Sequence, residues 1–323
     1  YTSWMMSPCA RKSDLNCLTC HTSSGRYRFN DPQKANHACL PCHQQHVAKP
    51  SAHTHHPADS PGSQCVACHM PMTEFARMRR SDHSMRPPAP AATIAFGSPN
   101  ACNGCHADRS PQWADQWVRQ WRTRDYQARV LAQGRLIQAA RQRDWTHLEA
   151  MLAVIDGHNR DEIVATSLIR LLRACKDPRV TPVLLAAMDD PSPLIRSSAA
   201  ESLGTMPSPD TVQALAAATR DPYRLVRIRA AQSLAGFGEF RAGQKLAGAI
   251  KEATGEYLAS LTARPDLWTA HYNLGTYHLV IEDYASAVKA YGTAIRLAPR
   301  EVLPRVNLAI AQSRQGDIAG AEA

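Results

Sequence analysis

Cys17-Leu18-Thr19-Cys20-His21 is the first of four copies of one pattern, Cys-x-x-Cys-His, in the first third of this 323-residue chain. The other copies are Cys39-Leu40-Pro41-Cys42-His43, Cys65-Val66-Ala67-Cys68-His69 and Cys102-Asn103-Gly104-Cys105-His106. Together they contain eight of the ten cysteines and leave out Cys9 and Cys175. The chemistry of this pattern determines what the first third of the chain is built around.

The spacing within each copy suits the covalent attachment of a haem. Two thiols three residues apart reach the two vinyl groups on one edge of a porphyrin, and the following His lies under the iron as its fifth ligand. Structural zinc is the competing interpretation, but a zinc site does not require a His directly after the second Cys. We therefore predict four covalently attached haem c groups, bound through Cys17, Cys20, Cys39, Cys42, Cys65, Cys68, Cys102 and Cys105, with His21, His43, His69 and His106 as proximal iron ligands.

Apolar residues are scarce around these motifs. From Cys17 to His106 the Leu, Ile, Val and Phe residues number only eight in ninety, a level typical of segments that do not fold by themselves. Porphyrins would supply the missing apolar core. We therefore expect a loop-rich multihaem cytochrome c region with little regular structure, unfolded without its haems.

Two families of helical repeats are predicted after the motifs. Asp190-Pro191, followed by Leu194-Ile195-Arg196, recurs at the same internal spacing as Asp221-Pro222 and Leu225-Val226-Arg227. An Asp-Pro pair is expected to open a helix, because Asp caps and Pro suits the first turn. This pattern resembles HEAT repeats.

A second and slightly longer period follows. Leu274-Gly275, Ala287, Tyr291, Ala294 and Pro299 occupy consensus positions of a tetratricopeptide repeat, and Ala253 and Tyr257 precede Ala287 and Tyr291 by one period. We therefore predict an all-α helical-repeat solenoid after the haem region. Its expected divisions are a tetrahaem cytochrome c domain over 1–112, HEAT-like repeats over 113–236 and tetratricopeptide repeats over 237–323, the last incomplete.

Histidines outside the motifs are candidates for the sixth, distal ligand of each iron. The haem region holds six: His37, His46, His53, His55, His56 and His83. This supply exceeds four irons and favours bis-histidine ligation, which is typical of electron transfer, whereas an open position is typical of catalysis. Asp82 is placed to orient the His83 ring, and Met70, Met72, Met78 and Met85 are alternative axial ligands.

The net charge of +9 does not require a nucleic acid partner. Two propionates on each haem would balance much of the Arg and Lys excess, and no nucleic-acid recognition motif accompanies the charge. No apolar run approaches the length of a membrane span. Because haem is attached to this motif outside the bacterial cytoplasmic membrane, we expect an exported protein, periplasmic or extracellular at the cell surface.

The order of elements resembles a known family. Cys68-His69-Met70-Pro71, then Asp82-His83-Ser84, then Pro99-Asn100-Ala101-Cys102, is similar to the multihaem c-type cytochromes that carry C-terminal tetratricopeptide repeats. The resemblance implies an exported electron-transfer protein of bacterial respiratory chains.

The leading functional hypothesis is an electron conduit. The motifs begin at Cys17, Cys39, Cys65 and Cys102, a spacing that leaves little protein between haems. The helical repeats would dock redox partner proteins or other copies of the chain, and the chain would in one variant polymerise into an extracellular cytochrome filament. The alternatives are a haem enzyme acting on nitrite or hydroxylamine and an electron-transfer subunit of a larger respiratory complex.

Overall fold

The computed structural model describes residues 2–75, 77–158, 160–237 and 246–322. The chain divides into two compact units, one of Tyr1–Ala139 with Asp161–Val164, the other of Ala140–Arg160 with Ala165–Ala323. The expected boundaries after residues 112 and 236 stay predictions, and the second adjoins 238–245, which lie outside the described residues.

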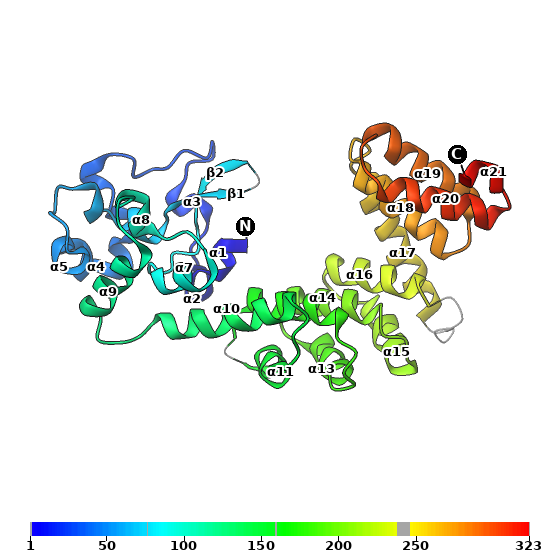
Figure 1. Cartoon of the computed structure of the whole chain (residues 1–323), viewed down its shortest axis with the longest axis horizontal. Coiled ribbons are helices and arrows are strands. Elements are labelled where there is room, and N and C mark those ends of the chain that lie inside the picture. The colour runs from blue at the N-terminus through cyan, green and yellow to red at the C-terminus, as the bar shows by residue number, and fades with distance from the viewer. Residues whose placement is uncertain (1, 76, 159, 238–245, 323) are drawn as a thin grey trace. The chain divides into compact units, whose positions relative to one another are not determined.

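The first unit consists of short helices, one hairpin and long irregular segments (Figure 1). Its strands β1 (Met72–Phe75) and β2 (Met78–Ser81) pair antiparallel, with Met72 opposite Ser81. Its helices are α1 (Thr2–Met6), α2 (Pro8–Lys12), α3 (Cys17–Cys20), α4 (Leu40–Ala48), α5 (Pro50–Thr54), α6 (Cys65–His69), α7 (Pro90–Phe96), α8 (Ala101–Cys105), α9 (Pro111–Trp121) and α10 (Gln127–Arg141), with 3-10 turns η1 (Pro32–Lys34), η2 (His37–Cys39) and η3 (Pro61–Ser63).

The protein core of this unit is small. Among described residues 2–139, the buried apolar side chains are six alanines, Val118 and Pro90. Such a set removes little apolar surface from water, since burial stabilises roughly in proportion to area. The local structure therefore agrees with the expectation that this region needs another apolar body as its core.

The second unit is entirely helical in its described part. Its helices are α11 (Leu148–Asp156), α12 (Glu162–Leu171), α13 (Val180–Ala186), α14 (Pro193–Leu203), α15 (Pro209–Ala218), α16 (Arg224–Ala235), α17 (Ala247–Thr262), α18 (Trp268–Val280), α19 (Tyr284–Leu297), α20 (Leu303–Gln315) and α21 (Ile318–Glu322), with 3-10 turns η4 (Leu172–Ala174) and η5 (Ala187–Asp189). Large side chains such as Leu168, Leu184, Ile195 and Leu215 are fully buried. The predicted fold class, a loop-rich region followed by helical repeats, is confirmed.

The repeated Asp-Pro pairs do not open the helices, contrary to expectation. Helices α14 and α16 begin at Pro193 and Arg224, shortly after each pair. The Asp221 carboxylate instead accepts hydrogen bonds from the Tyr223 N–H at 2.8 Å and from Nε and Nη2 of Arg196 at 2.7 and 3.0 Å. Asp190 forms an ion pair with Arg160. Each aspartate therefore binds an Arg from an earlier part of the chain and links neighbouring parts of the repeat region.

Close helix contact in the last repeats depends on a small residue. A Cβ atom on Gly275 of α18 would lie 2.7 Å from the ring of Tyr291 in α19. Tyr291 is fully buried with Ala287, and their counterparts one period earlier, Ala253 and Tyr257, are buried as well. These contacts agree with the period found in the sequence, and the assignment to tetratricopeptide repeats stays a prediction.

No helix in the described ranges is long and apolar enough to cross a membrane.

Candidate functional site

The first, third and fourth Cys-x-x-Cys-His motifs each fold around one short helix, whereas the second runs from η2 into α4 with a kink at His43. Helix α3 is formed by Cys17–Cys20 alone, and α8 ends at Cys105. The N–H of His21 donates to the carbonyl of Cys17 at 2.9 Å, and the N–H of His106 makes the equivalent bond to Cys102 at 2.9 Å. Because residues three apart in a helix lie on one face, both thiols of a motif point to the same side, as attachment to one porphyrin edge requires.

Three motif histidines face a histidine from another part of the chain. The ring centroids of His21 and His83 are 6.1 Å apart, those of His69 and His53 are 6.3 Å apart, and those of His106 and His56 are 6.1 Å apart. Metal–nitrogen bonds of about 2 Å put two imidazoles that bind one ion from opposite sides roughly 6 Å apart between centroids. The spacing of all three pairs therefore fits an iron between the rings.

Hydrogen bonds orient four of these rings. The Nδ1–H of His21 donates to the carbonyl of Gly25 at 3.0 Å, and that of His83 donates to Ser81 at 3.0 Å. The corresponding bonds of His69 to Arg86 and of His56 to Thr54 measure 3.2 and 2.7 Å. Proton placement on Nδ1 leaves the Nε2 lone pair available, as an iron ligand requires.

The electrostatic surroundings keep the histidine pair at the third motif uncharged. Burial, and secondarily the Arg122 guanidinium, lower the pKa of His53 to about 4. Burial also lowers the pKa of His69. Both rings are therefore neutral at pH 7, and the neutral imidazole is the form that binds metals. In the described part of the chain, no group of three or more His, Cys, Asp or Glu side chains is arranged to hold a metal ion by itself.

The remaining distal candidates lie elsewhere. His55 stacks on Trp121 of α9 with centroids 4.3 Å apart. His37 lies exposed in η2, and His46 lies in α4, one turn after His43 with centroids 6.2 Å apart. Among the described ring contacts, neither His37 nor His55 faces a motif histidine. The assignment of distal ligands stays a prediction for all six.

The expected role of Asp82 is wrong. Its carboxylate accepts hydrogen bonds from the N–H and the hydroxyl of Ser84, both at 2.9 Å, while the His83 ring is oriented by the Ser81 carbonyl. The reason is geometric, because an Asp readily accepts bonds from the residue two positions later and thereby closes a tight turn.

The four motifs are neighbours in space. The Cys39 and Cys65 side chains lie close enough to interact directly, which brings the second and third motifs together. Cys20 of the first motif is close enough to Cys39 to raise the pKa of that thiol, and Cys102 of the fourth motif does the same to Cys68. Haems attached at these positions would follow one another in sequence order.

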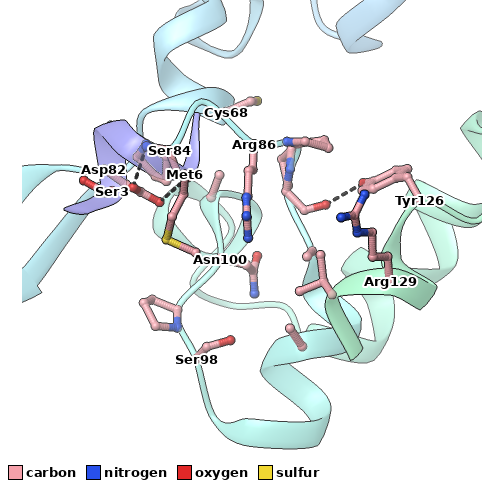
Figure 2. Close-up of a pocket in the computed structure, with 18 of the residues that line it drawn as sticks. Ser3, Met6, Cys68, Asp82, Ser84, Arg86, Ser98, Asn100, Tyr126 and Arg129 are labelled. Atoms are coloured by element: carbon pink, nitrogen blue, oxygen red, sulfur yellow. Dashed lines mark hydrogen bonds between the residues drawn. The ribbon is translucent and has the colours of Figure 1, made fainter. Parts of the chain in front are cut away.

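A cavity of about 430 Å³ adjoins the third motif, with Cys68 and Arg86 in its lining (Figure 2). The Arg86 side chain extends into the cavity and forms an ion pair with Asp161, whose side chain is only 4 % exposed. This ion pair anchors the segment whose carbonyl accepts the hydrogen bond from His69. The cavity therefore belongs to the site of the third motif.

Sequence reasoning missed the groups that support the histidines. Asn36 accepts a hydrogen bond from the N–H of Cys65 at 2.8 Å and donates to the Ser63 carbonyl at 3.1 Å, which ties the second motif to the third. A Cβ atom on Gly62 would lie 2.4 Å from the His56 ring. The sequence cannot show which backbone carbonyls orient the rings, because every residue has one. Asn36 and Gly62, however, lie close to the motifs in the sequence and could have been noted there.

Two family models match the chain. Residues 51–156 match cytochrome c552, and residues 135–259 match HEAT repeats. The first match contains the third and fourth motifs together with His53, His56 and His83. These findings confirm the predicted similarity to multihaem c-type cytochromes with HEAT-like repeats. No curated protein and no solved structure matches the chain.

Proposed function

We propose that this chain is an exported electron-transfer protein that carries four covalently bound haem c groups along one series. The eight motif cysteines bind the porphyrins, and the motif histidines are the proximal ligands. The distal ligands are His83 for the first motif, His53 for the third and His56 for the fourth. The observation that carries the proposal is the facing of these rings, with centroid distances of 6.1, 6.3 and 6.1 Å.

The chain's own residues favour electron transfer over catalysis at three of the sites. Bound haem c supplies an iron that changes oxidation state by one electron. The two facing histidines at each of these sites would both hold the iron, and a substrate would then find no free ligand position. The Nδ1 hydrogen bonds orient the rings of His56, His69 and His83. Burial lowers the pKa of His53 to about 4, so that this ring is neutral at pH 7.

The spacing of the motifs supports fast transfer between haems. The close approach of the Cys39 and Cys65 side chains puts the attachment edges of the second and third haems next to each other. The proximity of Cys68 to Cys102 does the same for the third and fourth. Export is part of the proposal because haem is attached to this motif outside the bacterial cytoplasmic membrane. Docking of redox partners by the repeats, filament assembly and the enzyme alternative stay predictions.

The test is low-temperature electron paramagnetic resonance of the oxidised holoprotein, with the number of haems taken from the intact mass. We expect the mass of four haems and low-spin signals from the three paired sites. The variants His83→Ala, His53→Ala and His56→Ala should each convert one haem to high spin, because each removes one axial ligand.

The control is His37→Ala, which removes an exposed candidate that faces no motif histidine among the described rings. Its spectrum should match that of the unmodified protein. If all three distal variants keep every haem low-spin, the ligand pairs are wrong. A high-spin signal in the unmodified protein that shifts on addition of nitrite or hydroxylamine would support the enzyme alternative.

A further inference from the structure

Four histidine rings lie in series between the second and third motifs. Successive centroid distances are 6.2 Å from His43 to His46, 4.4 Å from His46 to His53 and 6.3 Å from His53 to His69. The first and last distances are nearly equal, so distance alone suggests two equivalent ligand pairs. The two pairs are not equivalent, because His43 and His46 are close neighbours in the sequence whereas His53 and His69 are not.

The first pair, His43 and His46, cannot hold an iron between its rings. The two residues are three apart in α4, and a fully extended segment of that length spans at most about 11 Å. The backbone at His43 leaves helical geometry, with φ −123° and ψ 40°, but the segment after it is helical again. Residues one turn apart lie side by side at this spacing in any helix. Two ligands of one iron would instead require the backbone to pass around the edge of the porphyrin.

The middle pair, His46 and His53, is in direct ring contact. The two rings meet at 39° with centroids 4.4 Å apart, and this separation leaves no room for a metal between them. His53 also differs from His56 and His83, the other two proposed distal ligands. The rings of His56 and His83 are oriented by Nδ1 hydrogen bonds to carbonyls, whereas among the described hydrogen bonds none involves the His53 ring. The ring contact with His46 takes the place of that hydrogen bond.

We propose that His46 binds no iron and is a positioning residue, which holds the His53 ring against its iron from the side of the second haem. This inference rests on the proposed function, because it takes His53 as the distal ligand of the third haem. The His46 ring then lies between the second and third haem sites. It contacts His53, the proposed ligand of the third haem, and lies beside His43 of the second motif.

The test compares His46→Ala and His46→Phe in the oxidised holoprotein by electron paramagnetic resonance. His46→Ala should leave the haem number unchanged and produce no high-spin iron. It should shift the low-spin signal of one haem, since that signal depends on the angle between the two axial imidazoles. His46→Phe keeps a ring of similar shape without a metal-binding nitrogen, so its signal should match that of the unmodified protein.

His53→Ala identifies which low-spin signal belongs to the third haem, and only that signal should move in His46→Ala. New high-spin iron in His46→Ala would overturn the inference, because His46 would then be a ligand. An unchanged signal in His46→Ala would overturn it too, because the contact would then position nothing. If His53→Ala itself keeps every haem low-spin, the ligand assignment fails instead, independently of His46.

Discussion

Substitution of Gly62 by Ala should detach His56 from the iron that we propose it binds, without unfolding the protein. The added Cβ would lie 2.4 Å from Cδ2, 2.7 Å from Cγ and 3.0 Å from Nε2 of the His56 ring. Carbon atoms in contact are about 3.5 Å apart, so the ring has to move by roughly 1 Å. Gly62 does not have a positive φ, so its backbone can accommodate Ala without strain. The added methyl group therefore acts on the structure only by crowding the His56 ring.

A displacement of this size is large relative to a metal–nitrogen bond of about 2 Å. If the ring yields, the iron bound by His106 loses its sixth ligand, and one haem becomes high-spin in electron paramagnetic resonance. If the ring is instead held by its 2.7 Å hydrogen bond to the Thr54 carbonyl, the crowding should destabilise the fold by about 1–3 kcal/mol. Thermal unfolding followed by circular dichroism separates the two results.

Gly104→Ala is the matched control, since nothing lies within 4 Å of the Cβ that it would add. It belongs to the same motif as His106 and should leave both the spectrum and the melting temperature unchanged. The reasoning is refuted if Gly62→Ala also leaves both unchanged, because the close approach of Gly62 to the His56 ring would then not exist.

Three further predictions concern the helical repeats. Asp221→Ala should lower the free energy of unfolding by about 3 kcal/mol, because it leaves the Arg196 guanidinium, 12 % exposed, without its carboxylate; a loss below about 1 kcal/mol in denaturant titration would contradict this. Gly275→Ala should cost about 1–3 kcal/mol by crowding a buried ring in the next helix, and an unchanged denaturation midpoint would argue against that packing. Arg227 lowers the pKa of Glu256 through two hydrogen bonds. The pair therefore stabilises the fold fully above about pH 4.5, the pKa of Glu256 in the unfolded chain. This stabilisation is lost as the pH falls through the lower pKa that Glu256 has in the folded protein. The difference in melting temperature between the unmodified protein and Glu256→Gln should therefore shrink below about pH 4.5, and a constant difference would contradict the linkage.

The helical half of the chain was predictable in type because periodicity is local. Two regular spacings of apolar and small residues indicated helical repeats, and the structure has helices there. The exact starts of α14 and α16 were not predictable. Whether Asp190 and Asp221 cap a helix or bind an Arg depends on a side chain from another repeat, which the local sequence does not contain.

The sequence by itself determined the cofactor chemistry, because two thiols and a His at fixed short spacing stay close together whatever the surrounding fold. Only the tertiary structure decided which histidines face each other. Two complete motifs lie between His21 and His83, and the whole third motif lies between His56 and His106, so no short-range pattern links either pair. The same holds for the carbonyls that orient the rings, since the backbone offers an acceptor at every residue and only the folded path selects one.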